Sequence, residues 1–124
     1  MSYDRRILIA DDDCDIRSGV SELLAGLGLE ILEAETGTEA LAIVRQRRVH
    51  LAVLDMHMPG HTGLELLSFI RQEELSVPCI FCSGHATDAV MDMARAEGAS
   101  VVLKKPIEPL RLKSEVHRLL GLSA

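Results

Sequence analysis

The sequence predicts an α/β fold of the (βα)₅ type, in which a parallel five-stranded sheet lies between two layers of helices. Short apolar runs rich in Val, Ile and Leu alternate regularly with amphipathic stretches, as in sheets that are buried on both faces. Of the 124 residues, 48% are hydrophobic and only 2% aromatic, so aliphatic side chains must fill the core. We expect one domain that spans residues 1–124.

The apolar runs are the expected strands. They cover residues 7–10, 29–34, 51–54, 78–82 and 100–103. Each run is short and dominated by β-branched and aliphatic side chains, which is typical of strands inside a parallel sheet.

Apolar residues at helical spacing occupy the segments between the strands. The five stripes are Ile16, Val20, Leu23, Leu24 and Leu27; Leu41 and Val44; Leu64, Leu67 and Ile70; Ala89 and Met93; and Leu112, Val116, Leu119 and Leu120. We interpret each stripe as the core-facing side of a helix. Thr36 and Glu39 have the spacing of a capping box, and Gly26, Gly28 and Gly98 stand where helices are expected to end.

Charge and cysteine content exclude several classes of protein. The chain has 19 acidic and 13 basic residues, and its net charge of −6 opposes direct contact with nucleic-acid phosphates. The first apolar run is too short for a signal peptide or a membrane span, so we expect a cytoplasmic protein without membrane contact. The chain has three cysteines, Cys14, Cys79 and Cys82, and this small, odd number suits a reducing compartment better than a set of disulfide bonds. Cys79 and Cys82 stand three apart in an expected strand and so point to opposite faces, which argues against a redox or metal pair.

Polar residues follow four of the five expected strands. They are Asp11, Asp12 and Asp13 after the first strand, Asp55 at the end of the third, Ser83 at the end of the fourth and Lys105 after the fifth. Ligands of open parallel sheets bind at the carboxyl ends of the strands. We therefore expect these side chains to form one site.

The acidic residues of this group predict a metal site. Carboxylates held together repel one another unless a cation joins them, and Mg²⁺ commonly binds one or two carboxylates together with water and phosphate oxygens. We therefore expect Asp11, Asp12 and Asp55 to bind Mg²⁺, a site that Mn²⁺ can also occupy. A carboxylate between a metal ion and a lysine can attack phosphorus and form an aspartyl phosphate. Lys105 and the Ser83 hydroxyl can meet the charge on the phosphoryl oxygens.

These segments resemble the receiver domains of two-component response regulators, the CheY-like family. The resemblance covers essentially the whole chain and rests on residues 7–13 (ILIADDD), 54–60 (LDMHMPG), 81–85 (FCSGH) and 98–99 (GA) leading to 105–106 (KP), with Gly63 after the second segment. It implies a doubly wound, flavodoxin-like sheet of order 2-1-3-4-5. It also implies a signalling switch and not an enzyme, although such domains assist their own phosphorylation and dephosphorylation.

The resemblance assigns roles to the acidic residues. Asp55 matches the phosphoacceptor of the family. Asp11 and Asp12 match its metal ligands, together with Asp55 and the backbone carbonyl of His57.

The resemblance also assigns roles around the phosphate. Ser83 matches the hydroxyl that reorients toward the phosphoryl group, and Lys105 matches the family's lysine, whose bond to Pro106 is expected to be cis. His57 and His85 stand two residues beyond Asp55 and Ser83, where the family tunes the access of hydrolytic water.

One position departs from the family pattern. Four residues after Gly98 the family usually has Tyr or Phe, whose ring changes exposure when the switch hydroxyl moves, and here the residue is Val102. We expect phosphorylation to be intact, and its readout to depend less on this position and more on the loop at residues 83–87.

The resemblance implies partners as well. The phosphoryl donor is expected to be a histidine kinase or a histidine phosphotransfer protein, and the phosphorylated domain is expected to act on an output domain or a separate target protein. Receivers often dimerise or bind partners through the fourth helix, fifth strand and fifth helix, which would involve Met91, Lys104, Arg111 and Arg118. A phosphorylation-dependent homodimer is one such arrangement.

Two alternative functions need residues that this chain lacks, and a third stays open. A flavodoxin-like FMN carrier needs a Ser, Thr and Gly-rich phosphate loop after the first strand, where this chain has three aspartates. A phosphohydrolase of the haloacid dehalogenase type needs a second acid two residues after its nucleophile, where this chain has His57. A receiver-like scaffold that signals without phosphate remains the alternative, since Val102 departs from the family pattern although Asp55, Ser83 and Lys105 are present.

Overall fold

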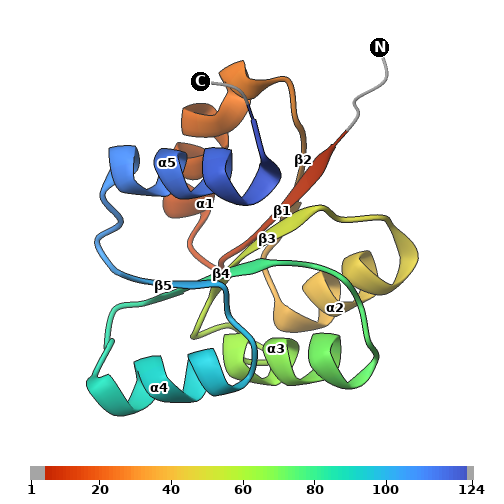
Figure 1. The fold of residues 1–124 in the computed structure, drawn as a ribbon, viewed down its shortest axis with the longest axis vertical. Coiled ribbons are helices and arrows are strands. Elements are labelled where there is room, and N and C mark those ends of the chain that lie inside the picture. The colour runs from red at the N-terminus through yellow and green to blue at the C-terminus, as the bar shows by residue number, and fades with distance from the viewer. Residues whose placement is uncertain (1–4, 123–124) are drawn as a thin grey trace.

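The computed structural model describes residues 5–122, which form alternating strands and helices (Figure 1). The strands are β1 (Arg6–Ala10), β2 (Glu30–Ala34), β3 (Leu51–Asp55), β4 (Cys79–Ser83) and β5 (Val101–Lys104). The helices are α1 (Cys14–Leu24), α2 (Gly37–Gln46), α3 (Gly63–Gln72), α4 (Asp88–Ala96) and α5 (Pro109–Leu120), with a short 3₁₀ helix, η1 (Ala25–Leu27), after α1. The predicted (βα)₅ pattern is confirmed, and every strand boundary lies within one residue of the expected position.

The sheet is parallel throughout, with strand order β2-β1-β3-β4-β5. This is the order that the family resemblance implied. In the register of the sheet Asp55 pairs with Cys82, and Ser83 pairs with Lys104. The carboxyl ends of β3, β4 and β5 therefore lie at one edge, and the segments that leave these strands begin side by side.

Helices cover both faces of the sheet. Helices α1 and α5 lie on one side, and α2, α3 and α4 lie on the other (Figure 1). The core under α1 and α5 includes Ile7, Ile9, Val20, Leu24, Leu51, Ile80, Leu112 and Val116. The core under α2, α3 and α4 includes Leu8, Leu41, Val44, Leu54, Leu66, Leu67, Ile70 and Phe81. Successive apolar residues of β1, β3 and β4 enter opposite cores because side chains alternate along a strand. Between residues 5 and 122, no helix has the length and apolar character needed to cross a membrane.

The two strand cysteines lie in different cores, as their spacing predicted. Cys79 packs under α2, α3 and α4, and Cys82 packs under α1 and α5. Burial raises the pKa of each thiol to about 12. Both are free thiols, and Cys14 is free and exposed. The C-x-x-C spacing therefore has no redox geometry, because the two sulfur atoms are separated by the sheet.

The helix ends match the predicted punctuation with one difference. Thr36 caps α2 by accepting a hydrogen bond from the Glu39 amide at 3.0 Å. The Glu39 carboxylate, however, accepts from the Glu35 amide at 3.0 Å and not from Thr36, so the predicted capping box forms only in half. A complete box occurs instead at the start of α3, between Thr62 and Glu65.

Helix α4 forms as expected, but the prediction of its buried face was wrong. Ala89 is exposed and Met93 is 52% exposed, whereas Ala94 is buried and Val90 and Met91 are half-buried. Asp88, Asp92 and Arg95 share one side of this helix and apolar residues cover the rest, so spacing does not say which part of that broad apolar surface is buried. The packing of α4 against β5 and α3 decides which side is covered.

Candidate functional site

Three chain segments that are far apart in the sequence meet at the carboxyl edge of the sheet. Asp11 follows β1, Asp55 ends β3 and Lys105 follows β5. The Lys105 ammonium lies between the two carboxylates, with Nζ 2.8 Å from Asp11 Oδ2 and 2.9 Å from Asp55 Oδ1. Both aspartates are only 5% exposed. The predicted convergence of these residues is confirmed as geometry, and their chemical roles remain predictions.

The carboxylates of Asp11, Asp12 and Asp55 form a group that fits a divalent cation. One oxygen from each lies within 4.8 Å of the others, and Asp12 is exposed where the other two are buried. An all-oxygen donor set of this kind suits Mg²⁺ or Mn²⁺. Three carboxylates and one lysine leave a formal charge of −2, which a divalent cation neutralises. The exposed side at Asp12 leaves room for the water and phosphate ligands that Mg²⁺ keeps.

The side chain of Asp11 is held from two directions. Its Oδ1 accepts a hydrogen bond from the Asp13 amide at 2.9 Å, and its Oδ2 accepts from Lys105. Asp13 in turn caps α1, accepting from the amides of Asp15 and Ile16. The acidic run therefore has two physical roles, since Asp13 starts the helix while Asp11 and Asp12 face the site.

Burial and the contacts between Asp55 and Lys105 shift the pKa of both side chains. Burial raises the pKa of the Asp55 carboxyl, and repulsion from Asp11 and Asp12 adds to this, while the hydrogen bond from Lys105 opposes it. For Lys105, burial lowers the pKa, but the hydrogen bonds to Asp11 and Asp55 outweigh burial and the pKa is raised. Lys105 is thus a firmly protonated cation beside a carboxylate that is costly to ionise, which is a suitable arrangement for a site that gains a cation.

Ser83 lies at the same edge of the sheet, at the end of β4, which stands between β3 and β5. It is 1% exposed at the end of β4, and its backbone carbonyl accepts a hydrogen bond from the Lys105 amide at 2.9 Å. Its hydroxyl accepts from the His85 amide at 3.1 Å. The hydroxyl hydrogen therefore remains able to donate to another acceptor. The Lys105-Pro106 bond is cis, as the resemblance implied.

The remaining predicted residues lie around this centre. His57 and His85 are both exposed, and their rings make an edge contact with centroids 5.9 Å apart. They come from the loops after β3 and β4, so the structure brings the two predicted rim positions together. Val102 is 8% exposed and packs into the core under α2, α3 and α4.

Gly63, which is part of the family resemblance, and Arg17 make contacts near the site that the sequence did not predict. The amide of Gly63 donates to the Met56 carbonyl at 3.0 Å, and a Cβ at Gly63 would lie 2.5 Å from the carbonyl oxygen of Asp55. Arg17 reaches from α1 to the backbone of Asp11. The G-x-x-G spacing after Pro59 was visible in the sequence, but its close approach to the strand was not. Arg17 carried no signal, because an arginine on an amphipathic helix is ordinarily solvated.

Known proteins show which family has this architecture. The family model described as the response regulator receiver domain matches residues 7–117. The chain belongs to the response regulator receiver domain family. A response regulator receiver protein from an Anaeromyxobacter species is 36% identical over 108 residues, covering 87% of this chain and 45% of that protein. The phosphate regulon transcriptional regulatory protein of Pseudomonas aeruginosa is 31% identical over 118 residues, covering 94% of this chain and 52% of that protein.

Solved structures agree with the family assignment. The crystal structure of a CheY-like response regulator receiver domain protein from Methanospirillum hungatei superposes with a TM-score of 0.89 at 29% identity, covering 97% of this chain and 95% of that chain. A Vibrio cholerae chemotaxis protein, CheY4, gives 0.85 at 29% identity, covering 96% of this chain and all of that chain. The chain spans about half the length of the two curated relatives above. It is a receiver domain of two-component signal transduction, the signalling class in which the receiver accepts a phosphoryl group.

Proposed function

We propose that this receiver accepts a phosphoryl group on Asp55 in a reaction that depends on Mg²⁺ bound by Asp11, Asp12, Asp55 and the backbone carbonyl of His57. The observation that supports this most directly is the position of Lys105, whose Nζ lies within 2.9 Å of both buried carboxylates. Bound Mg²⁺ would neutralise charge on the transferring phosphoryl oxygens.

The residues of the site then have separate tasks. An oxygen of Asp55 attacks phosphorus and forms the new P–O bond, while the P–N bond of a phosphohistidine donor breaks and its electron pair returns to the imidazole nitrogen. Lys105 and the Ser83 hydroxyl donate hydrogen bonds to the phosphoryl oxygens. His57 and His85 stand at the exposed rim and limit the approach of the water that later hydrolyses the aspartyl phosphate.

The partners follow from this chemistry. The donor is a histidine kinase or a histidine phosphotransfer protein, and the phosphorylated face is read by an output domain or a separate target. Phosphate on Asp55 makes the site more negative, and that change is what a partner can recognise. We place this switch in the cytoplasm, because its three cysteines are free thiols of the kind found in a reducing compartment. We class the protein as a signalling switch that assists its own phosphorylation and dephosphorylation.

The proposal is tested by intact mass after incubation with Mg²⁺ and a small acyl phosphate donor. We expect one added phosphoryl group on the unmodified chain. No adduct is expected for Asp55→Asn or after the metal is chelated. The matched control is Asp92→Asn, which makes the same chemical change at an exposed position on α4 and should leave the adduct unchanged.

Rapid hydrolysis is separated from failure by a second measurement. Beryllofluoride forms a stable mimic of the aspartyl phosphate, and we expect it to shift the amide resonances around Asp55 only when Mg²⁺ is present. A folded protein that gives neither the adduct nor the beryllofluoride complex would overturn the proposal in favour of a scaffold that signals without phosphate.

A further inference from the structure

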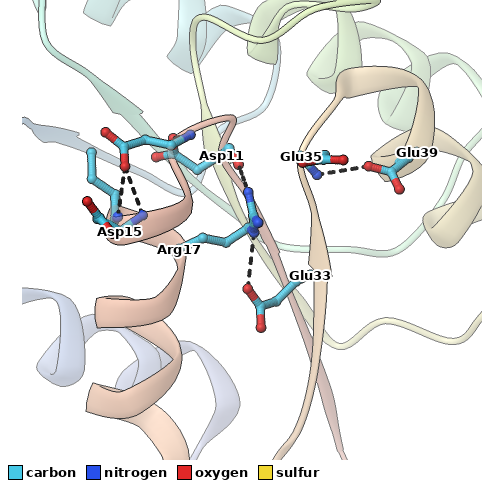
Figure 2. A network of polar contacts seen from close by, with 8 residues as sticks. Asp11, Asp15, Arg17, Glu33, Glu35 and Glu39 are labelled. Carbon is cyan, nitrogen blue, oxygen red and sulfur yellow. Dashed lines mark hydrogen bonds and ion pairs between the residues drawn. The ribbon is translucent and has the colours of Figure 1, made fainter.

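Arg17, in the first half of α1, bonds both to Asp11, which follows β1, and to Glu33 on β2. Its Nη1 donates a hydrogen bond to the backbone carbonyl oxygen of Asp11 at 2.8 Å, and its Nε donates to Glu33 Oε1 at 3.1 Å. Figure 2 shows the guanidinium between the Asp11 carbonyl and the Glu33 carboxylate on β2. The Arg17 side chain is only 14% exposed, so its conformation is fixed by neighbours on most sides. This is unlike the arginines at the protein surface, whose side chains in ion pairs such as Arg71 with Glu97 are 56% exposed.

The bond to Asp11 completes the restraint of that residue. Its amide donates to the Ala34 carbonyl at 3.0 Å, its two carboxylate oxygens accept from Asp13 and Lys105, and its carbonyl accepts from Arg17. Every polar group of Asp11 therefore has a partner. Three of these partners hold its amide and its side chain, and within residues 5–122 its carbonyl is held by Arg17 alone.

The carbonyl of Asp11 also determines where Asp12 lies. A peptide unit is planar, so the orientation of the Asp11 carbonyl fixes the direction in which the chain reaches the Cα of Asp12. Among the described residues, the Asp12 side chain has no hydrogen bond of its own and is exposed. The backbone of Asp12 is thus restrained on one side by the peptide plane that Arg17 holds, and on the other by the bond from the Asp13 amide to Asp11 Oδ1.

We propose that Arg17 is a positioning residue of the cation site, which orients the peptide between Asp11 and Asp12 so that their carboxylates are arranged for Mg²⁺. This inference rests on the proposed function, because it concerns the same cation. Glu33 has a supporting task, since its carboxylate holds the guanidinium fork in the orientation that reaches the carbonyl. Groups that orient metal ligands in this way typically change metal affinity by about 10-fold to 100-fold when they are removed.

A purely electrostatic role for Arg17 predicts the opposite change in Mg²⁺ affinity. The guanidinium is a positive charge near a cation site, so its removal alone should strengthen Mg²⁺ binding. Loss of positioning should weaken binding instead. The direction of the change in Arg17→Ala therefore separates the two roles.

The experiment measures the Mg²⁺ dissociation constant of the full chain by isothermal titration calorimetry. We expect Arg17→Ala to bind Mg²⁺ about 10-fold more weakly. Arg17→Lys keeps the charge but loses the two-pronged geometry, so it should bind with intermediate affinity. The double variant Arg17→Ala with Glu33→Gln removes one charge of each sign and should bind as weakly as Arg17→Ala.

A matched control removes another ion pair to β2. Arg6 pairs with Glu30 at 2.7 Å at the opposite end of the strands, so Arg6→Ala should leave Mg²⁺ affinity unchanged. Thermal unfolding with the metal chelated shows whether each variant is folded, and Arg17→Lys serves as the test if Arg17→Ala is not. Unmodified protein that binds no Mg²⁺ would overturn the proposed function and this inference together. Normal binding by the unmodified protein, with equal or tighter binding by Arg17→Ala, would overturn the inference alone.

Discussion

The site has two halves that are held in different ways. The acidic half, Asp11, Asp12, Asp55 and Lys105, is joined across β1, β3 and β5 by contacts between residues up to 94 positions apart. In the hydroxyl half, Ser83 is tied to the sheet by the Lys105 amide, whereas residues 84–87 are held by local bonds, from the His85 amide to the Ser83 hydroxyl and from the Thr87 amide to the His85 carbonyl. Long-range contacts fix one half to the sheet, whereas local bonds can be exchanged at lower cost. The acidic half is thus preorganised for the chemistry, and the loop of the hydroxyl half can change its conformation when phosphate is added.

The sharpest test of the acidic half is Lys105→Ala. This change removes the cation shared by two buried carboxylates, and we expect the rate of phosphorylation by a small donor to fall by about 100-fold. The measurement is the initial rate of adduct formation by intact mass at saturating Mg²⁺. The neighbouring Lys104→Ala is the control, because Lys104 is exposed and no charged partner of it is found between residues 5 and 122. Equal rates for the two variants would show that Lys105 is only a structural ion-pair residue.

The next largest effect is expected at Gly63, on the side of α3 that faces Asp55. A Cβ there would lie 2.5 Å from the Asp55 carbonyl oxygen and 3.0 Å from Phe81 Cε2. We expect Gly63→Ala to lower the free energy of unfolding by about 2 kcal/mol, the usual cost of overpacking. Urea unfolding measures this change.

Another glycine provides the comparison for Gly63. An added Cβ at Gly19 in α1 meets no atom within 4 Å, so Gly19→Ala should raise the free energy of unfolding by about 0.5–1 kcal/mol through helix propensity. The two substitutions should therefore change the free energy of unfolding in opposite directions. If Gly63→Ala were also stabilising, the acidic half would be less rigid than its contacts indicate.

A smaller effect is expected in the hydroxyl half. Ser83→Ala removes one hydrogen bond to the phosphoryl group, so the phosphorylation rate should fall by about 10-fold, in line with a bond to a charged group. The dissociation constant for Mg²⁺ should not change, because Ser83 is not among the clustered carboxylates. Calorimetry and initial rates on the same variant check both expectations. A large loss of Mg²⁺ affinity would show that the two halves are not separable.

The sequence predicted the acidic half better than the hydroxyl half, for a physical reason. Parallel strands bring their carboxyl ends to one edge, so Asp11, Asp55 and Lys105 had to meet once the strands were recognised. The spacing of these residues therefore predicted which side chains converge. The geometry of the β4–α4 loop depends on local hydrogen bonds, such as that from the His85 amide to Ser83, which spacing does not encode.

The same distinction explains what was missed elsewhere. The buried face of α4 was wrongly predicted because apolar residues cover every side of that helix except the one with Asp88, Asp92 and Arg95, and tertiary packing decides which of them are buried. Arg17 was missed because its two contacts depend on the angle at which α1 leaves β1. Sequence patterns define which elements form and in which order, whereas the partners of a single side chain depend on the exact placement of those elements.

The smallest effect on the chemistry, and the most informative one about the hydroxyl half, is expected from Val102→Tyr. Val102 packs among the apolar residues of the core under α2, α3 and α4, so the phosphorylation rate should stay within about twofold. An aromatic ring at this edge strand adds a bulky group whose exposure can follow the loop at residues 84–87. We therefore expect the beryllofluoride-induced amide shifts of that loop to extend to residue 102 and to be larger than in the unmodified chain.

Val102→Leu is the control for this substitution, because it adds volume without a ring. Shifts that are enlarged in Val102→Tyr but not in Val102→Leu would show that the aliphatic residue limits how far the response travels from Ser83 to β5. Identical shifts in all three proteins would contradict this, and would place the whole response in the backbone of the loop. The acidic half should behave identically in all three, since its ties to the sheet do not pass through Val102.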